Sequence, residues 1–285
     1  MSELLSPRFL AELEAYRRRF GFPVRSGAAG ARGSKHGGSS AEFLEHREYA
    51  PGDDARRIDW SAFARSRKVV IKRFRAEEDA WIRLLLDASG SMAFGEPTKY
   101  VHAQRICAAL GYLALAQGER VDACVASKER ARTEVLRGAA ARAPLLKTLD
   151  SRGPRGQARL AEVLRASVAQ SKHHVAFVVV SDFLEPEVIE ALRHAAARGH
   201  LLVLLQVLSP SEIDPALFGD FNLQDAETGQ TLPFSADDLS LAEYRRALGE
   251  LQDTLRRIAH GTRGRFELSA AGEPVAELLQ RLIAA

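Results

Sequence analysis

The stretch that decides the fold is WIRLLLDASGSM, from Trp81 to Met92. A mostly apolar run, typical of a buried β-strand, ends here in the carboxylate of Asp87 and then in hydroxyls at alternate positions, Ser89 and Ser91. Oxygen-bearing side chains at the mouth of a sheet can hold a cation, arm a nucleophile or cap a helix. The rest of the sequence has to decide among these roles.

From Trp81 onward, strand-like and helix-like segments alternate. The aliphatic runs at 120–127, 174–182 and 200–208 indicate strands buried on both faces, which is typical of a parallel sheet covered by helices on both sides. We therefore predict a doubly wound, mostly parallel α/β fold. The other elements expected are strands at 81–86, 133–136 and 265–268, helices at 99–117, 140–149, 158–171, 186–198, 241–260 and 274–284, and a hairpin insertion near 219–235.

The chain divides into two predicted regions. Residues 1–77 hold a helix at 7–20, capped by Ser6, then a Gly/Ser-rich loop and an extended arm. Residues 78–285 form the α/β domain. We expect the arm to pack against this domain.

The composition favours a globular protein, with 46% hydrophobic residues in 285. Its 40 basic and 37 acidic residues nearly balance, so the net charge of +3 does not favour nucleic acid. The basic segment 65–75 has Phe74 as its one aromatic residue and is more typical of a docking edge or a solvated face. A nucleic-acid-binding module is kept as an alternative.

The cysteines and the lengths of the apolar runs indicate in which cellular compartment to expect the protein. Cys107 and Cys124 stand inside helical and strand patterns, so we interpret both as core residues rather than as disulfide or zinc ligands. No apolar run is long enough to suggest a membrane span, and the N-terminal segment does not have the pattern of a signal peptide. We expect a cytoplasmic protein.

A second polar pair follows the strand at 174–182, in Ser181 and Asp182. Ligands of open α/β sheets collect at the carboxyl ends of strands near the topological switch point. Carboxylate and hydroxyl oxygens there are ligands that Mg²⁺ or Mn²⁺ accepts, usually with waters and an open position. Helix capping explains each residue singly, but the joint pattern favours a metal site made of Asp87, Ser89, Ser91 and Asp182.

DASGSM and the downstream VVVSDF resemble the metal-ion-dependent adhesion site of von Willebrand factor type A domains. The upstream REYAPGDDARRIDWSAFARSRKVVIKRF resembles the signature of a bacterial family, domain of unknown function 58, as do LQDAETGQTLPF and the C-terminal EPVAELLQRLI. The resemblance covers nearly the whole chain. It implies a chaperone-like adaptor that works with a MoxR-type AAA+ ATPase in assembly, maturation or metal insertion of a client protein, and not an enzyme.

The resemblance also assigns ligand roles. It makes Asp87, Ser89 and Ser91 the ligands of the first loop and Asp182 a ligand through water. Related domains supply a direct threonine ligand from a Gly-Gly-Thr-x-Leu stretch, whereas this chain reads GQARL, with Ala158 in that place. We therefore expect weakened binding of Mg²⁺ or Mn²⁺.

The signature segment has two interpretations. It can be a salt-bridged turn that holds the arm on the α/β domain, or a surface that binds the ATPase. For Asp59 and Trp60 we favour the first, with Trp60 anchored in a pocket. The candidate partner-binding residues are Arg47, Tyr49, Asp53, Asp54, Arg57, Asp59 and Trp60.

The alternative function, an enzyme instead of a binding protein, is that of an α/β-hydrolase. Ser91, Asp182 and His260 follow the chain order of its catalytic triad. However, neither Ser89 nor Ser91 stands in Gly-x-Ser-x-Gly, the turn that exposes the nucleophile. His260 also ends a predicted helix, where the helix dipole favours a basic residue without catalysis.

Overall fold

The computed structural model describes residues 4–17, 19, 42–50, 53, 58–75, 81–127, 131–157, 159–171 and 173–284. Its internal contacts divide the chain into two units. The α/β unit comprises Met1–Val24 and Ala80–Ala285, and the arm unit comprises Arg25–Asp79.

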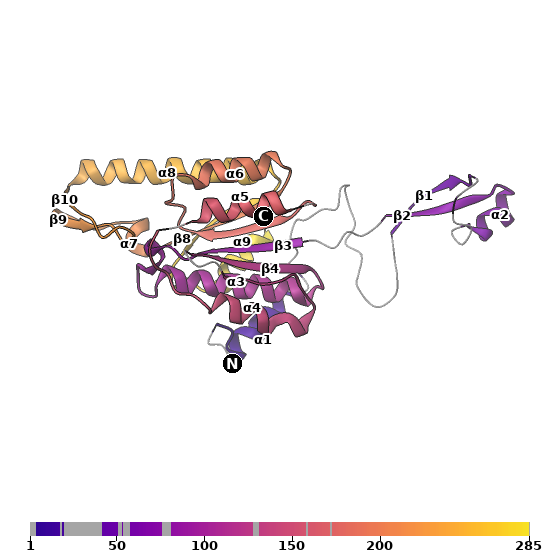
Figure 1. Cartoon of the computed structure of the whole chain (residues 1–285), viewed down its shortest axis with the longest axis horizontal. Coiled ribbons are helices and arrows are strands. Elements are labelled where there is room, and N and C mark those ends of the chain that lie inside the picture. Colours follow the sequence, from indigo (N-terminus) through magenta and orange to yellow (C-terminus); the bar gives the residue numbers. More distant parts are fainter. Residues whose placement is uncertain are drawn as a thin grey trace. The chain divides into compact units, whose positions relative to one another are not determined.

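The α/β unit is built on a seven-stranded sheet with the order β11-β8-β7-β3-β4-β5, in which β6 also pairs with β4 (Figure 1). β11, β8, β7, β3 and β4 are parallel, and β5 and β6 are antiparallel to β4. The predicted doubly wound, mostly parallel α/β fold is confirmed. The strands are β3 (Trp81–Asp87), β4 (Arg120–Ala126), β5 (Ala131–Arg132), β6 (Leu136–Arg137), β7 (Ala176–Ser181), β8 (Leu201–Leu208) and β11 (Arg265–Ala270).

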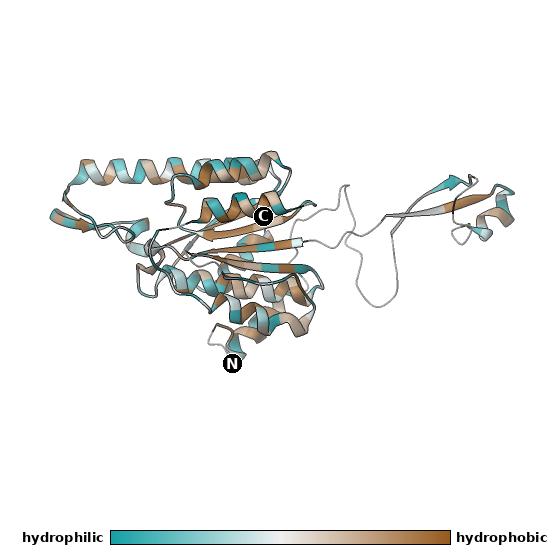
Figure 2. Cartoon of the chain, viewed as in Figure 1, coloured by the Kyte–Doolittle hydropathy of each residue, from teal (hydrophilic) through white to brown (hydrophobic). Residues whose placement is uncertain are grey.

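Helices cover both faces of this sheet because its strands are apolar on both sides, as the brown strands of Figure 2 show. One core joins the sheet to α1 (Pro7–Tyr16), α3 (Lys99–Ala116), α4 (Arg142–Leu149) and α9 (Val275–Ala284). The other joins it to α5 (Leu160–Gln170), α6 (Val188–Ala197) and α8 (Asp238–Gly261). No helix in the described part of the chain is both long and apolar enough to cross a bilayer.

Helix α1 packs differently from the expected grouping of residues 1–77. Ser6 caps it as predicted, since the Ser6 hydroxyl accepts a hydrogen bond from the Phe9 N–H at 3.2 Å. Leu13 is fully buried in the core beside α3 and α9, and Tyr112 of α3 donates to Glu14. The apolar face of α1 thus belongs to the α/β unit, while the arm is a unit by itself.

The edge of the sheet beside β4 also differs from the prediction. We expected one strand at 133–136, but β5 and β6 lie on either side of Thr133–Val135. The Thr133 N–H donates to the Ala123 carbonyl at 2.9 Å, but the Ala123 N–H donates to the Thr133 hydroxyl at 2.9 Å instead of to a backbone carbonyl. One of the two bonds at this point is therefore a side-chain bond, which sequence alternation alone does not reveal.

Two short elements complete the α/β unit near the predicted insertion. β9 (Gly219–Gln224) and β10 (Thr231–Ala236) form the expected antiparallel hairpin. The short helix α7 (Pro210–Ile213) precedes it and was not predicted.

The arm unit contains an antiparallel pair, β1 (Glu42–Glu48) and β2 (Val70–Arg75), with α2 (Trp60–Ser66) between them in sequence. Asp59 caps α2, because its Oδ1 accepts from the N–H groups of Ser61 and Ala62 at 3.0 and 3.1 Å. Ile58 bridges to Ile71 and joins the start of α2 to the strand pair.

The buried His200 makes the stability of the α/β unit depend on pH. Its Nδ1 accepts from the Val175 N–H at 3.2 Å, and burial first, then nearby cationic groups, lower its pKa to about 4. In the unfolded chain the imidazole of His200 takes up a proton near pH 6.5, whereas in the folded protein it does so only near pH 4. The free energy of unfolding therefore falls as the pH drops through this range, by about 2 kcal/mol between pH 7.5 and 5. His200→Asn keeps an acceptor but cannot be protonated, so urea unfolding of this variant should show a smaller loss. An equal loss in both proteins would contradict this role of His200.

Candidate functional site

The two predicted loops meet at the switch point of the sheet. β3 lies between β4 and β7, and the helices that follow β3 and β7 cover opposite faces, so the chain opens a crevice where these strands end. Ser181, at the end of β7, donates to Asp87 Oδ2 at the end of β3 over 2.6 Å. The sheet therefore brings together the residues that the sequence placed about a hundred positions apart.

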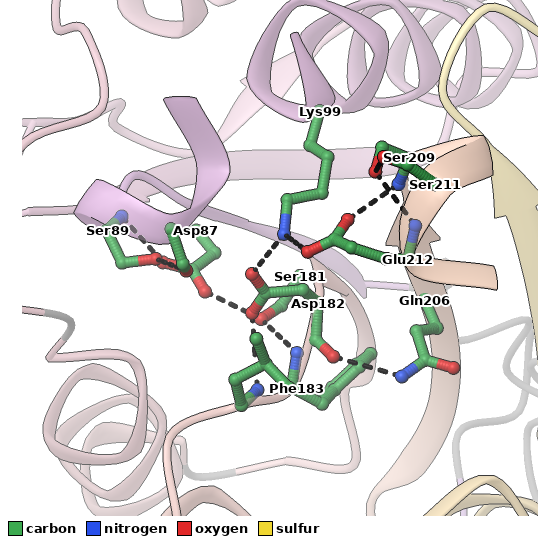
Figure 3. Close-up of polar contacts among 12 residues, drawn as sticks. Asp87, Ser89, Lys99, Ser181, Asp182, Phe183, Gln206, Ser209, Ser211 and Glu212 are labelled. Atoms are coloured by element: carbon green, nitrogen blue, oxygen red, sulfur yellow. Dashed lines mark hydrogen bonds and ion pairs between the residues drawn. The ribbon is translucent and has the colours of Figure 1, made fainter. Parts of the chain in front are cut away.

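The first loop gathers its oxygens around Asp87 (Figure 3). The Ser89 N–H donates to Asp87 Oδ1 at 2.9 Å, and the hydroxyls of Ser89 and Ser91 lie 3.0 Å apart. Asp87 and Ser89 are buried, while Ser91 is half-buried. The loop thus presents a pair of hydroxyls beside a buried carboxylate.

Asp87 is a carboxylate without a cationic partner among the described residues. Burial first, then the nearby charge of Asp182, raise its pKa to about 7, although the hydrogen bonds from Ser181 and Ser89 oppose this shift. Burying a charge without an opposite charge is costly. The position therefore favours the arrival of either a proton or a cation.

Asp182 already has a cationic partner, Lys99, at the first residue of α3. Lys99 Nζ donates to Asp182 Oδ2 at 2.8 Å and to Glu212 Oε1 at 2.6 Å (Figure 3). The Lys99 side chain is fully buried. Burial lowers the pKa of Lys99, but the two carboxylates outweigh that effect and raise it, so the ammonium stays charged.

The loop after β7 is held in a tight turn. Phe183 has a φ of 60°, which a non-glycine residue adopts only when its surroundings require it. Its N–H donates to the Ser181 hydroxyl at 2.8 Å, and Gln206 donates to the Asp182 carbonyl at 3.0 Å. These bonds fix Asp182 in position toward Lys99.

Sequence reasoning missed Lys99, Glu212 and the bridging role of Ser181. A lysine at the start of a helix is usually solvated, so nothing local marked Lys99 as buried. Glu212 did carry a signal, because Ser209 and Glu212 have the spacing of a capping box, which the structure contains.

The tip of the β9–β10 hairpin lies against the first loop. A Cβ atom on Gly90 would stand 2.5 Å from the carbonyl oxygen of Ala226, which is closer than atoms can pack. The Gly90 N–H donates to the Gly156 carbonyl at 2.8 Å. Gly90 therefore lets the hairpin tip and the 155–157 segment approach the site together.

An open pocket of about 810 Å³ lies beside the loop. Ser91, Glu212 and Ala226 line it, together with Phe94 and Leu184, which are both 53% exposed. The site therefore opens to a surface that carries exposed apolar side chains.

The described residues contain no group of three or more His, Cys, Asp or Glu side chains that could hold a metal ion. Asp87 and Asp182 are the acidic members of the predicted ligand set, and the serine hydroxyls supply its other donors. Ala158, which stands in place of the expected threonine, lies outside the described residues.

The candidate partner-binding residues belong to the arm unit, and two of them, Arg47 and Asp53, bond to each other. Arg47 donates to Asp53 Oδ1 at 2.6 Å, and the Ala50 N–H donates to Asp53 Oδ2 at 2.8 Å. Asp59 is buried as the cap of α2 and contacts His46 Nε2 at 2.9 Å.

The aromatic candidates of the arm are exposed. Trp60, the first residue of α2, is 63% exposed, so the described residues of the arm unit do not bury it, and its anchoring in a pocket of the α/β unit stays a prediction. Tyr49 is 38% exposed. Asp54 and Arg57 lie outside the described residues.

Comparisons with known proteins identify the family. A family model described as a protein of unknown function, DUF58, matches residues 45–253. The uncharacterized protein Rv1480 of Mycobacterium tuberculosis is 30% identical over 231 residues, which cover 79% of this chain and 73% of that protein.

Solved structures with similar folds are more distant. An aerotolerance-related membrane protein from Bacteroides fragilis matches 72% of this chain and 98% of its own, with a TM-score of 0.46 and 16% identity. Proximal thread matrix protein 1 of the mussel byssus, with a zinc-occupied MIDAS motif, matches 72% of this chain and 47% of its own, with a TM-score of 0.43 and 11% identity.

The close approach at Gly90 can be tested by adding one methyl group. We expect Gly90→Ala to lower the free energy of unfolding by about 1–3 kcal/mol, because the hairpin tip must move away. Gly249→Ala in α8, where a Cβ meets nothing within 4 Å, is the matched control and should raise stability by about 1 kcal/mol. Urea unfolding of both variants checks this; equal stabilisation by the two substitutions would show that the tip does not pack here.

Proposed function

As the chain belongs to the DUF58 family of proteins of unknown function, we propose that it is a cytoplasmic protein-binding adaptor rather than an enzyme. Its working surface in this proposal is the carboxyl edge of the sheet around Ser89 and Ser91, with a divalent cation as an aid to binding. Its proposed partners are a MoxR-type AAA+ ATPase and a client protein, in assembly, maturation or metal insertion.

The observation that carries the proposal is the serine pair beside Asp87. Neighbouring ligands of an octahedral Mg²⁺ ion, each about 2.1 Å from the metal, lie about 3 Å apart. The hydroxyls of Ser89 and Ser91 are hydrogen-bonded to each other at 3.0 Å, a spacing that also suits two ligands of one ion, beside a buried carboxylate that no described cation neutralises. These residues therefore fit a divalent cation that keeps several waters.

In this proposal the two serine hydroxyls and Asp87 would hold the cation. The bound cation would supply a positive charge with an exchangeable position, which suits a carboxylate of a partner protein. Phe94 and Leu184, exposed on the walls of the adjacent pocket, offer apolar contact to the same partner.

The geometry gives less support to the hydrolase alternative. Both carboxylate oxygens of Asp182 are engaged, by Lys99 and by the Leu184 N–H, rather than by His260. His260 is exposed in the last turn of α8. A triad would need His260 oriented by Asp182 and within reach of Ser91.

The nucleic-acid alternative stays a prediction. Arg65, Arg67 and Lys68 are exposed on the arm unit, and Trp60 is exposed on the same helix as Arg65. A salt-dependent shift on single-stranded DNA would favour it over protein binding.

The metal part of the proposal predicts saturable binding of Mn²⁺ and Mg²⁺ to metal-stripped protein in calorimetric titrations. Asp87→Ala should weaken binding about 10- to 100-fold, because it removes the charge that supports the ion. Asp253→Ala removes an exposed carboxylate of α8 and should leave binding unchanged. Titrations in which Asp87→Ala binds as well as the wild type would contradict a site at this loop.

The adaptor part predicts a direct complex with the MoxR-type ATPase of the same organism. We expect the double substitution Ser89→Ala and Ser91→Ala to weaken the complex about tenfold or more, if a few central residues carry the contact. The measurement is the affinity of the complex, determined with the ATPase immobilised on a sensor surface. Nucleotide is left out so that metal bound to ATP does not interfere. Trp60→Ala is the parallel variant for the arm. Undiminished binding by both variants would contradict docking at either surface.

A further inference from the structure

Lys99 is the feature of the site that a metal-binding loop does not explain. Its side chain is fully buried, and it points from the first residue of α3 toward the ends of β3 and β7 (Figure 3). A buried ammonium is costly unless it is paired and hydrogen-bonded. Here Asp182 at 2.8 Å and Glu212 at 2.6 Å meet both conditions.

Each carboxylate oxygen of Asp182 already accepts a hydrogen bond in this arrangement. Oδ2 accepts from Lys99, Oδ1 accepts from the Leu184 N–H at 3.2 Å, and its backbone carbonyl accepts from Gln206. A cation approaching Asp182 would meet an ammonium already there and would have to displace it or lie beside a like charge.

Asp87 has the opposite surroundings. Its two oxygens accept from neutral groups, the Ser89 N–H and the Ser181 hydroxyl, and no lysine or arginine of the described residues pairs with it. The two carboxylates at neighbouring strand ends thus differ in kind, since one is charge-balanced from within the chain and the other is not.

We propose that Lys99 is a permanent cation of this site. It balances the charge of Asp182 as a metal ion would, and it thereby confines any divalent ion to the side formed by Asp87, Ser89 and Ser91. The inference deepens the proposed function and rests on its metal site. Glu212 makes Lys99 a link as well, because the same carboxylate accepts from the Ser209 N–H in the capping box of α7. Lys99 therefore ties the loop after β7 to the helix that leads into the hairpin.

The test is a titration with Mn²⁺ in which free Mn²⁺ is measured by electron paramagnetic resonance. The proteins compared are the wild type, Lys99→Met, and a double variant that combines Lys99→Met with Asp182→Asn. Lys99→Met should bind Mn²⁺ about tenfold or more tightly, because it removes a positive charge and frees Asp182 and Glu212. The double variant removes Lys99 and Asp182 as a neutral pair and should stay within about threefold of the wild type. Lys147→Met, an exposed lysine of α4, is the control.

Each outcome separates this inference from the proposed function. If the wild type binds Mn²⁺ and Lys99→Met binds it no more tightly, Lys99 does not restrict the ion and the inference is wrong, while the proposed metal site stands. If the double variant loses tenfold or more, Asp182 acts as a metal ligand, and again the inference is wrong while the proposed metal site stands. If Lys99→Met binds and the wild type does not, the inference holds and the proposed metal site of the wild type fails. If neither binds, both fail.

Folding of the variants is monitored in the same samples. Circular dichroism and thermal unfolding with and without Mn²⁺ show whether Lys99→Met is folded. If Lys99→Met is unfolded without metal, adding Mn²⁺ should make it fold, because binding stabilises the folded state that binds the ion. The midpoint temperature of its thermal unfolding should then rise more with Mn²⁺ than that of the wild type. The double variant keeps the net charge of the site and leaves only Glu212, whose side chain is 20% exposed, without its bond to Lys99, so it keeps the test open in either case.

Discussion

The ion pair between Lys99 and Asp182 is the interaction on which the site depends. Two parallel strands lead side by side into aspartates, Asp87 at the end of β3 and Asp182 directly after β7, and without Lys99 both carboxylates would be buried without an opposite charge. Interiors tolerate charge only when it is paired or neutralised. Lys99 balances Asp182 and leaves Asp87 as the carboxylate of this site without an opposite charge among the described residues, beside two hydroxyls.

The surrounding fold serves the same arrangement. The doubly wound order places the ends of β3 and β7 at the switch point, so the two loops cannot avoid each other. Ser181 joins them through Asp87, and Gly90 admits the hairpin tip against the first loop. The site is therefore built from segments across the whole α/β unit, and a movement of α7 or of the hairpin would reach it through Glu212 or Ala226.

The sequence predicted the fold well because its strongest signals were physical ones. Strands buried on both faces are mostly apolar, as β7 and β8 are apart from Ser181 and Gln206, so their length and continuous apolar pattern identified them. The meeting of Asp87 with Asp182 followed from topology alone. The boundary of the arm was predicted less well, since the sequence grouped α1 with the arm. Tertiary contacts decide on which unit an amphipathic helix such as α1 packs.

The missed features share a cause. Lys99, and likewise Arg83, which pairs with Asp122 at 2.8 Å inside the sheet, are charged residues whose partners are distant in sequence. A single sequence shows such residues as solvated until the partner is known. Tertiary pairing, rather than local pattern, decides each of these positions.

The most direct test of the account is the position of Mn²⁺ in crystals of the wild-type protein, located by anomalous scattering. The account predicts one peak within coordination distance of the Ser89 and Ser91 hydroxyls, with Lys99 still bonded to Asp182. A peak at Asp182 with Lys99 displaced would contradict the division of the site into a metal side and a lysine side.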